Sequence, residues 1–155
     1  GVVTTATGYM GGDSPNPTYE QVCSHSTGHA ETVRVVFDTA LTSAADLVRL
    51  FFEIHDPTQV GGQGNDIGDQ YRSAIWTTTP EQLRDATALR AAYQEVLTER
   101  GFGPIQTVIS PAPDADSTAR FWYAEDYHQQ YLFKNPGGYE CHARTGIACP
   151  ALPHE

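Results

Sequence analysis

The chain predicts a two-layer domain of the α/β or α+β class, because strand-like and helix-like segments interleave along its 155 residues. The clearest strand pattern covers residues 31–37, where Val33, Val35 and Phe37 share one face of the expected strand. The opposite face is half apolar, which is typical of a strand inside a covered sheet. Further β-prone runs are expected at residues 2–5, 72–77 and 105–110.

Two capped amphipathic segments predict the main helices. Ser43 and Asp46 form a capping box, and the apolar residues that follow at helical spacing predict a helix over residues 44–55. Thr79 at the N-cap and Pro80 at the first helical position predict the start of a longer helix. That helix is expected to end near Arg100, and a further helix is expected over residues 122–133.

The remaining sequence predicts loops and a tail on a single domain. No repeat and no domain boundary is visible, so we expect residues 1–155 to form one domain. Residues 135–155 are rich in glycine and proline and have no hydrophobic periodicity. They predict a mobile coil tail that carries Cys141 and Cys149.

Composition excludes several classes of protein. The net charge of −10 argues against a nucleic-acid-binding protein, which would need clustered lysine and arginine to neutralise phosphates. No run approaches the roughly 18 apolar residues of a membrane span, and no signal peptide is visible. We therefore expect a cytoplasmic protein that does not bind membranes.

Cysteine, histidine and glutamate gather in a turn-rich loop ahead of the first clear strand. The spacing of Cys23, His25, His29 and Glu31 could supply four zinc ligands, but no second ligand pair lies nearby and Thr27-Gly28 breaks any helix that would align them. A hydrogen-bonded polar loop is the more frequent outcome of such a pattern. The total of three cysteines is odd, so a purely structural disulfide framework is not expected.

Two other polar segments have a structural and a functional interpretation. Residues 63–72 would place Asp66 and Tyr71 at the edge of a sheet, although glycine, asparagine and aspartate are also ordinary turn residues. Residues 123–131 could be a solvated helix face with aromatic packing, in which His128 becomes a candidate only if it faces the other loops.

Longer motifs in these same segments resemble one family, the type A peptide methionine sulfoxide reductases. The motifs occur in that family's order and cover nearly the whole chain. They are Gly8-Tyr9-x-Gly11-Gly12, Asn16-Pro17-Thr18-Tyr19-x-x-Val22-Cys23, Thr27-Gly28-His29-Ala30-Glu31, Ile54-His55-Asp56-Pro57-Thr58, Gln63-Gly64-Asn65-Asp66-x-Gly68-x-Gln70-Tyr71-Arg72-Ser73-Ala74-Ile75 and Tyr123-Ala124-Glu125-x-x-His128-Gln129-x-Tyr131-Leu132.

The resemblance implies a fold and an activity. The fold would be α+β, a two-layer sandwich of a mixed sheet with flanking helices, a ferredoxin-like core and a long coil tail. The activity would be thiol-dependent reduction of methionine-(S)-sulfoxide, free or in proteins, to methionine, which repairs oxidative damage. No cofactor is implied. The partners would be the sulfoxide substrate and thioredoxin or a similar dithiol, and the protein would be a monomer.

The resemblance also assigns roles to individual residues. Glu31 would be the acid that protonates the sulfoxide oxygen, and Tyr19 and Tyr71 would donate hydrogen bonds to it. Asp66 would order a water molecule or the Glu31 network. In the tail, Cys141 would resolve a sulfenic acid and Cys149 would accept the disulfide by exchange.

One departure from the family pattern concerns the nucleophile. The family's nucleophilic cysteine lies in a Gly-Cys-Phe-Trp-Gly motif about a dozen residues before a segment that matches Gly1-Val2-Val3, and no Cys-Phe-Trp occurs in this sequence. The family's first core strand is absent with it. Two alternatives therefore remain beside the reductase: a catalytically inactive binding module of the same fold and a metal-binding domain that uses Cys23, His25 and His29.

Overall fold

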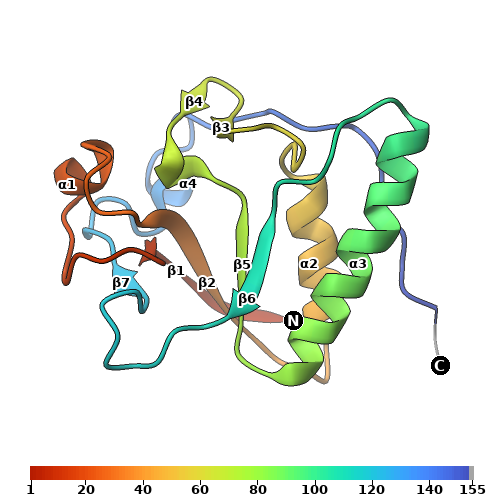
Figure 1. Ribbon diagram of the computed structural model, residues 1–155. Helices are drawn as coiled ribbons and strands as arrows, with labels where there is room; N and C mark the ends of the chain where they lie inside the picture. Colours follow the sequence, from red (N-terminus) through yellow and green to blue (C-terminus); the bar gives the residue numbers. More distant parts are fainter. Residues whose placement is uncertain (154–155) are drawn as a thin grey trace.

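The computed structural model describes residues 1–153 and has the expected α+β class. Its strands belong to three sheets, which are the antiparallel β2-β1-β7 sheet, the β3-β4 hairpin and the parallel pair β5-β6. In Figure 1 the pair β5-β6 stands between the β1-β2 region and helices α2 and α3. Among the described residues, none of the helices is both long enough and apolar enough to cross a lipid bilayer.

The element bounds follow the chain in order. The strands are β1 (Val2–Met10), β2 (Ala30–Phe37), β3 (Gly62–Gln63), β4 (Asp66–Ile67), β5 (Ala74–Thr77), β6 (Val108–Pro111) and β7 (Trp122–Tyr123). The helices are α1 (Tyr19–Cys23), α2 (Ala44–Glu53), α3 (Pro80–Glu99) and α4 (Tyr131–Lys134), with a 3₁₀ turn η1 (Asp69–Tyr71).

The capping signals identified both long helices. Ser43 Oγ accepts from the Asp46 amide while the Asp46 carboxylate accepts from the Ser43 amide, so the capping box that begins α2 is confirmed. The Thr79 hydroxyl caps α3, and Pro80 occupies its first turn. These side chains satisfy amide donors that have no partner inside the helix.

The expectation of a helix over residues 122–133 was wrong. Residues 122–123 pair with β1 instead, and only residues 131–134 are helical. The Gln129 side chain explains the difference, because its amide bonds to both the N–H and the C=O of Thr7 and fixes this segment beside β1. Gln130 then takes a left-handed conformation with φ 54°, which no continuous α-helix tolerates.

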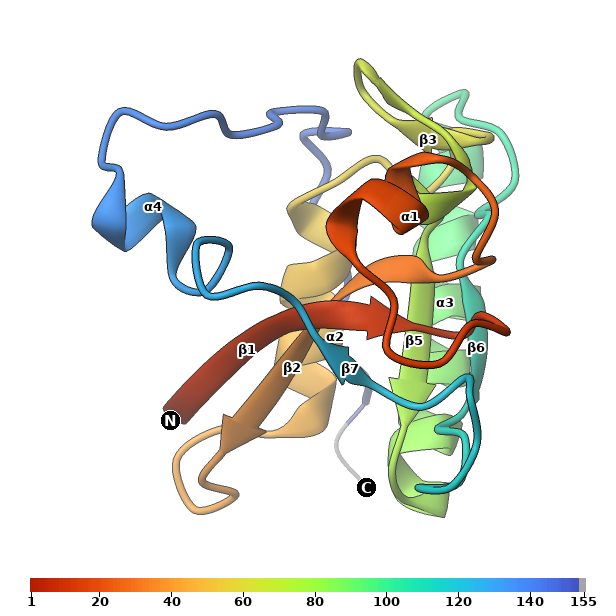
Figure 2. The same cartoon turned by 90° about the vertical axis from the view of Figure 1, so that its left-hand side faces the viewer.

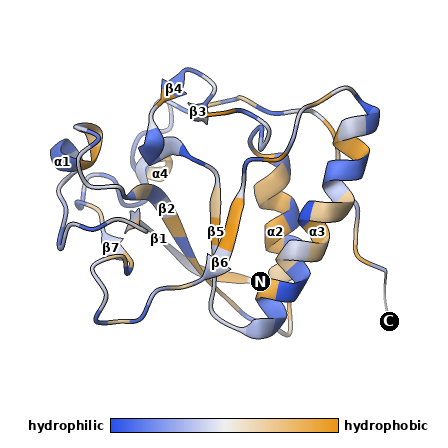
Figure 3. Cartoon of the chain, viewed as in Figure 1, coloured by the Kyte–Doolittle hydropathy of each residue, from blue (hydrophilic) through white to orange (hydrophobic). Residues whose placement is uncertain are grey.

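The hydrophobic core has two parts. The larger cluster joins α2, α3 and the tail, and its buried members are Phe52, Leu89, Tyr93, Leu97, Ile105 and Cys149. A smaller cluster of Tyr9, Val22 and Ala124 lies beneath α1. Figure 3 shows the apolar residues gathered along β6, α2 and α3, whereas the turns around α1 and β4 are more polar.

Strand β2 forms an outer edge of its sheet and exposes apolar side chains. Within residues 1–153, β1 alone pairs with β2, and Val33 is 60% exposed while Val36 is 44% exposed. An uncovered edge of this kind offers unpaired backbone groups to another strand. The face that contains Val33 also contains Glu31, because alternate residues of a strand point the same way.

Candidate active site

A small pocket between β1, β2, α1 and the segment after β7 brings together two of the residues expected in the site. Its volume is about 30 Å³, and Tyr19 and Glu31 both line it. Glu31 comes from β2 and lies opposite Tyr9 of β1 in the antiparallel ladder. The other lining residues are Thr7, Tyr9, Ala124 and His128.

Tyr71 and Asp66 approach the same group of residues from the β3-β4 hairpin and the η1 turn. Burial raises the pKa of Tyr71, and the charges of Glu31, Cys23 and Asp66 raise it further. The charge of Asp66 also raises the pKa of Glu31. The structure therefore places Tyr19, Glu31, Asp66 and Tyr71 within electrostatic reach of one another, although they come from four separate elements.

The Glu31 carboxyl is the carboxylic acid of this group whose pKa is shifted upward. Burial raises its pKa, and the negative charge of Asp66 raises it further, because both disfavour a second carboxylate there. The ion pairs within residues 1–153 do not include Glu31. Residue Glu31 as a whole nevertheless keeps part of its surface in contact with solvent, so the burial of its carboxyl is incomplete.

The two phenols keep their protons at neutral pH. Cys23 lies one turn after Tyr19 on α1, and interaction with Cys23 followed by burial raises the pKa of Tyr19 to about 12. The pKa of Tyr71 is also raised, chiefly by burial. Neutral phenols donate hydrogen bonds, so both can serve an oxygen atom that gains negative charge.

Glu125 holds the walls of the pocket together, which the sequence did not indicate. Its carboxylate accepts from the Tyr9 hydroxyl at 3.1 Å, the Tyr127 hydroxyl at 3.1 Å and the Tyr19 backbone amide at 3.2 Å. These donors come from β1, the segment after β7 and α1. The carboxylate thus fixes the start of α1 relative to the sheet.

His128 lines the pocket opposite Tyr19, so it faces another segment of the site, as the sequence analysis required of a candidate. Its ring lies between Tyr19 and Tyr127, with centroid separations of 4.8 and 4.3 Å. Its Nε2 atom is buried and has no hydrogen-bond partner within the described part of the chain. A polar group of a bound molecule could fill that position.

Two polar contacts hold the turns of the site together. His25 Nδ1 lies 3.1 Å from Asp69 Oδ1 and links the end of α1 to η1. The Arg72 guanidinium donates to the carbonyl oxygens of Gly28 and Asp69 at 2.9 and 3.0 Å. Both contacts set the position of the η1 turn, which ends at Tyr71.

The possible zinc ligands have other roles. His29 is 1% exposed, its Nδ1 accepts from the Gly12 amide and its Nε2–H donates to the Ser14 carbonyl. His25 contacts Asp69 instead. Within residues 1–153, no three His, Cys, Asp or Glu side chains gather in a way that could hold a metal ion.

The two tail cysteines lie in different surroundings. Cys141 is half-buried beside the β3-β4 hairpin, with Sγ 3.6 Å from the Gln63 carbonyl oxygen. The nearby Tyr139 hydroxyl donates to Asp66 at 3.0 Å and so attaches this part of the tail to the site. Cys149 is 1% exposed in the larger core cluster, and burial raises its pKa to about 11.

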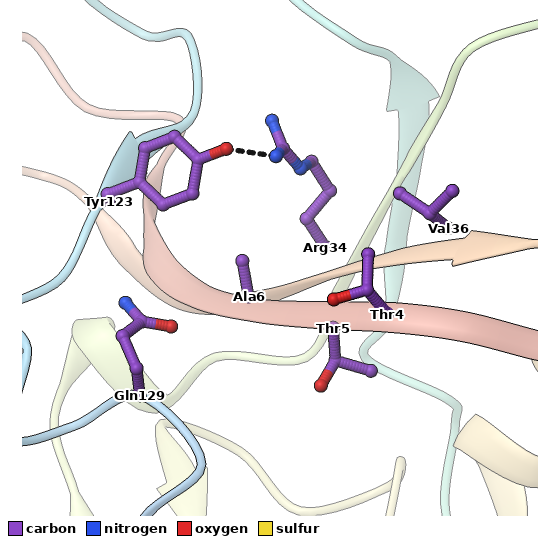
Figure 4. A pocket seen from close by; sticks show the side chains of 7 residues that line it. All are labelled: Thr4, Thr5, Ala6, Arg34, Val36, Tyr123 and Gln129. Carbon is purple, nitrogen blue, oxygen red and sulfur yellow. Dashed lines mark hydrogen bonds between the residues drawn. The ribbon is translucent and has the colours of Figure 1, made fainter.

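A second cavity, about 340 Å³, lies on the opposite face of the β1-β2 ladder and is open to solvent. Figure 4 shows Arg34 pointing across it to the Tyr123 hydroxyl, and the Arg34 guanidinium also stacks over the ring of Phe121. None of the six expected site residues lines this cavity. Of the two pockets, only the smaller one is lined by expected site residues, Tyr19 and Glu31.

Comparison with known proteins assigns the family. A family model described as peptide methionine sulfoxide reductase matches residues 1–152. The chain belongs to the peptide methionine sulfoxide reductase family. It is 56% identical over 151 residues to peptide methionine sulfoxide reductase MsrA of Azorhizobium caulinodans and 56% identical over 150 residues to that of Streptomyces griseus. These matches cover 97% of this chain and 66% of each relative, so the chain spans just under two thirds of their length.

Solved structures of similar proteins have the same fold. Methionine sulfoxide reductase A of Corynebacterium diphtheriae superposes with a TM-score of 0.83 at 44% identity, covering 99% of this chain and 73% of that chain. Mxr1 of Saccharomyces cerevisiae in reduced form has a TM-score of 0.77 at 35% identity, and the match covers 92% of this chain and 77% of Mxr1. The unusual oxidized form of Mxr1 has a lower TM-score of 0.57. All three cysteines of the present reductase-family chain are unbonded.

Proposed function

We propose that this protein reduces methionine-(S)-sulfoxide, free or in proteins, to methionine. The observation that carries the proposal is that Glu31 and Tyr19 line one small pocket, while Tyr71 and Asp66 lie within electrostatic reach of Glu31. That group combines an acid of raised pKa with two neutral phenols. Such a combination suits a reaction in which an oxygen atom gains charge and takes up a proton.

The first step would be attack of a cysteine thiolate on the sulfoxide sulfur. Glu31 would give its proton to the sulfoxide oxygen while Tyr19 and Tyr71 donate hydrogen bonds to the same atom. The S–O bond and the new S–S bond then break as the hydroxyl passes to the cysteine sulfur, so that the methionine thioether leaves and the cysteine becomes a sulfenic acid. The negative charge of Asp66 would add to the effect of burial in raising the pKa of Glu31.

The later steps would regenerate the thiol. The Cys141 thiol attacks the sulfenic sulfur, so that a disulfide forms and one water molecule leaves. The Cys149 thiolate then attacks Cys141, which frees the first cysteine and leaves a Cys141–Cys149 disulfide. Thioredoxin or a similar dithiol would reduce that bond. A monomeric cytoplasmic protein would suit this reductant.

The nucleophile itself is not among Cys23, Cys141 and Cys149 in this interpretation. Cys141 and Cys149 act in the relay, and Cys23 contacts Tyr19 from within α1. We infer that the nucleophile belongs to a segment outside Gly1–Glu155, in agreement with the greater length of the relatives.

An assay with resolved sulfoxide epimers tests this function. The full-length protein is mixed with dithiothreitol and peptides that contain either the S or the R epimer of methionine sulfoxide. We expect many turnovers of the S epimer and none of the R epimer. Binding of the S peptide without turnover would instead identify a binding module, and the intact mass of the same sample shows whether a nucleophile-bearing segment is present.

A further inference from the structure

The end of the tail is held against the core by an alternating pattern that the sequence did not show. Thr145, Ile147 and Cys149 are partly or fully buried, whereas Gly146 and Ala148 are exposed. This is the period of an extended chain that lies on a surface. Figures 1 and 2 show the tail crossing the top of the molecule from α4 and then descending beside α2 and α3.

Three side chains hold this segment through its backbone. Glu53 Oε1 accepts from the Cys149 amide at 2.8 Å, and Arg49 Nε donates to the Cys149 carbonyl at 3.2 Å. The Tyr93 hydroxyl donates to the Ile147 carbonyl at 2.7 Å and lies 2.8 Å from Thr145 Oγ1. We call Arg49, Glu53 and Tyr93 the tail anchor.

The tail anchor keeps the two tail thiols apart. Cys149 has both of its backbone polar groups bonded to α2, and its thiol packs among Phe52, Tyr93 and other core residues. Cys141 lies beside the β3-β4 hairpin instead. A disulfide requires Cα atoms about 4.4–6.8 Å apart, and thiol exchange requires an accessible thiolate. The anchored segment must therefore detach before Cys149 can react.

We propose that the tail anchor is a gate for the second thiol–disulfide exchange, and that Arg49, Glu53 and Tyr93 are positioning residues for Cys149. This inference rests on the proposed function. In the gated step the Cys149 thiol loses its proton and its sulfur bonds to Cys141. The bond between Cys141 and the first cysteine breaks, and the released thiolate takes up a proton. The gate limits how often the disulfide reaches Cys149 and becomes available to the external dithiol.

Alkylation of each cysteine in the reduced full-length protein tests the gate without any turnover. Iodoacetamide labelling, resolved by peptide mass spectrometry, is expected to modify Cys149 at least tenfold more slowly than Cys141. Loss of one anchoring hydrogen bond in Tyr93→Phe or Glu53→Ala is expected to speed Cys149 labelling by about 2- to 10-fold. Equal rates for Cys149 and Cys141 in the wild type, or unchanged rates in both variants, would overturn the proposal.

Matched variants separate the anchor from general destabilisation. Glu53→Gln keeps an acceptor oxygen and should label Cys149 at close to the wild-type rate. Tyr139→Phe removes a hydroxyl from the other end of the tail and should leave Cys149 labelling unchanged. The rate of Cys149 labelling should also depend little on the concentration of dilute urea, because only the tail opens. If this rate depends on urea as steeply as global unfolding does, a separate gate is refuted.

A second readout links the gate to the relay. The full-length protein receives one equivalent of sulfoxide substrate, the reaction is stopped with acid, and the Cys141–Cys149 disulfide is quantified by mass. The anchor variants should form this disulfide faster than the wild type by the factor seen in alkylation. If no variant forms the Cys141–Cys149 disulfide, both the relay of the proposed function and the gating role are wrong. If only the alkylation result fails, the gate is refuted and the proposed reductase activity is unaffected.

Discussion

Tyr9 and Glu31 face one another across the β1-β2 ladder, but their side chains have different partners. The Tyr9 hydroxyl donates to Glu125, and Glu31 lines the pocket without an ion pair among the described residues. The two paired residues therefore have different roles. Tyr9 supports the wall of the pocket, and within residues 1–153 the Glu31 carboxyl has no charged partner that would prevent it from acting as an acid.

Glu125→Ala should destabilise the fold and displace Tyr19. Three donors lose their acceptor, and one of them is the hydroxyl of Tyr9, which is only 2% exposed. We expect the free energy of unfolding to fall by about 1–3 kcal/mol in urea titration. Asp126→Ala is the control, since this exposed neighbour should change stability by less than about 0.5 kcal/mol. Equal effects of the two substitutions would refute the role of Glu125.

The phenols should contribute to catalysis rather than to substrate binding. Tyr19→Phe and Tyr71→Phe each remove one donor to the developing oxyanion and should lower kcat about 10²-fold with little change in KM. Tyr123→Phe is the matched control, because that hydroxyl lies at the cavity on the opposite face of the ladder. A kcat in both site variants that equals the Tyr123→Phe value would exclude the phenols from the reaction.

His55 should make stability depend on pH. It is 6% exposed, its Nδ1–H donates to the Phe51 carbonyl and its Nε2 accepts from Ser73, so burial lowers its pKa. The unfolded chain then takes up a proton near pH 6.5 while the folded chain does not. Stability from this group is complete above pH 6.5 and is lost as the pH falls toward the folded pKa.

The matched variant for this effect is His55→Asn. Urea unfolding at several pH values between 8 and 5 should show the wild type losing free energy of unfolding as the pH falls. The slope of that loss should be smaller in His55→Asn, because the variant has no imidazole to protonate in the unfolded state. Identical slopes in the two proteins would show that His55 does not contribute to the pH dependence.

Local signals made much of the fold predictable. Ser43 with Asp46, and Thr79 with Pro80, marked the helix starts because capping acts over three or four residues. The five-residue helix α1 was missed because it is too short to show periodicity, although Thr18 and Gln21 form a capping box that could have revealed it. Segment 122–133 was misassigned because a tertiary contact, Gln129 with Thr7, overrode its helical pattern.

The candidate site was predictable only in part. The resemblance named Glu31, Tyr19, Tyr71 and Asp66, and the structure brings them into one neighbourhood. The role of Glu125 could not be predicted, because its bond to Tyr9 joins residues 116 positions apart and no local pattern encodes such a contact. The burial of Cys149 was also unforeseen, because it depends on packing against residues of α2 and α3 that are far away in the sequence.

The pH dependence of single-turnover sulfoxide reduction tests most directly whether Glu31 is the proton donor. The full-length protein is compared with Glu31→Gln, and Glu95→Gln on α3 serves as a charge-matched control. The wild-type and control rates should fall as the pH rises through the raised pKa of Glu31, because the acid must be protonated to act. The single-turnover rate of Glu31→Gln should be lower by about 10²- to 10⁴-fold and should not show this fall with rising pH. A Glu31→Gln protein that keeps the wild-type rate and the same fall with pH would contradict the account.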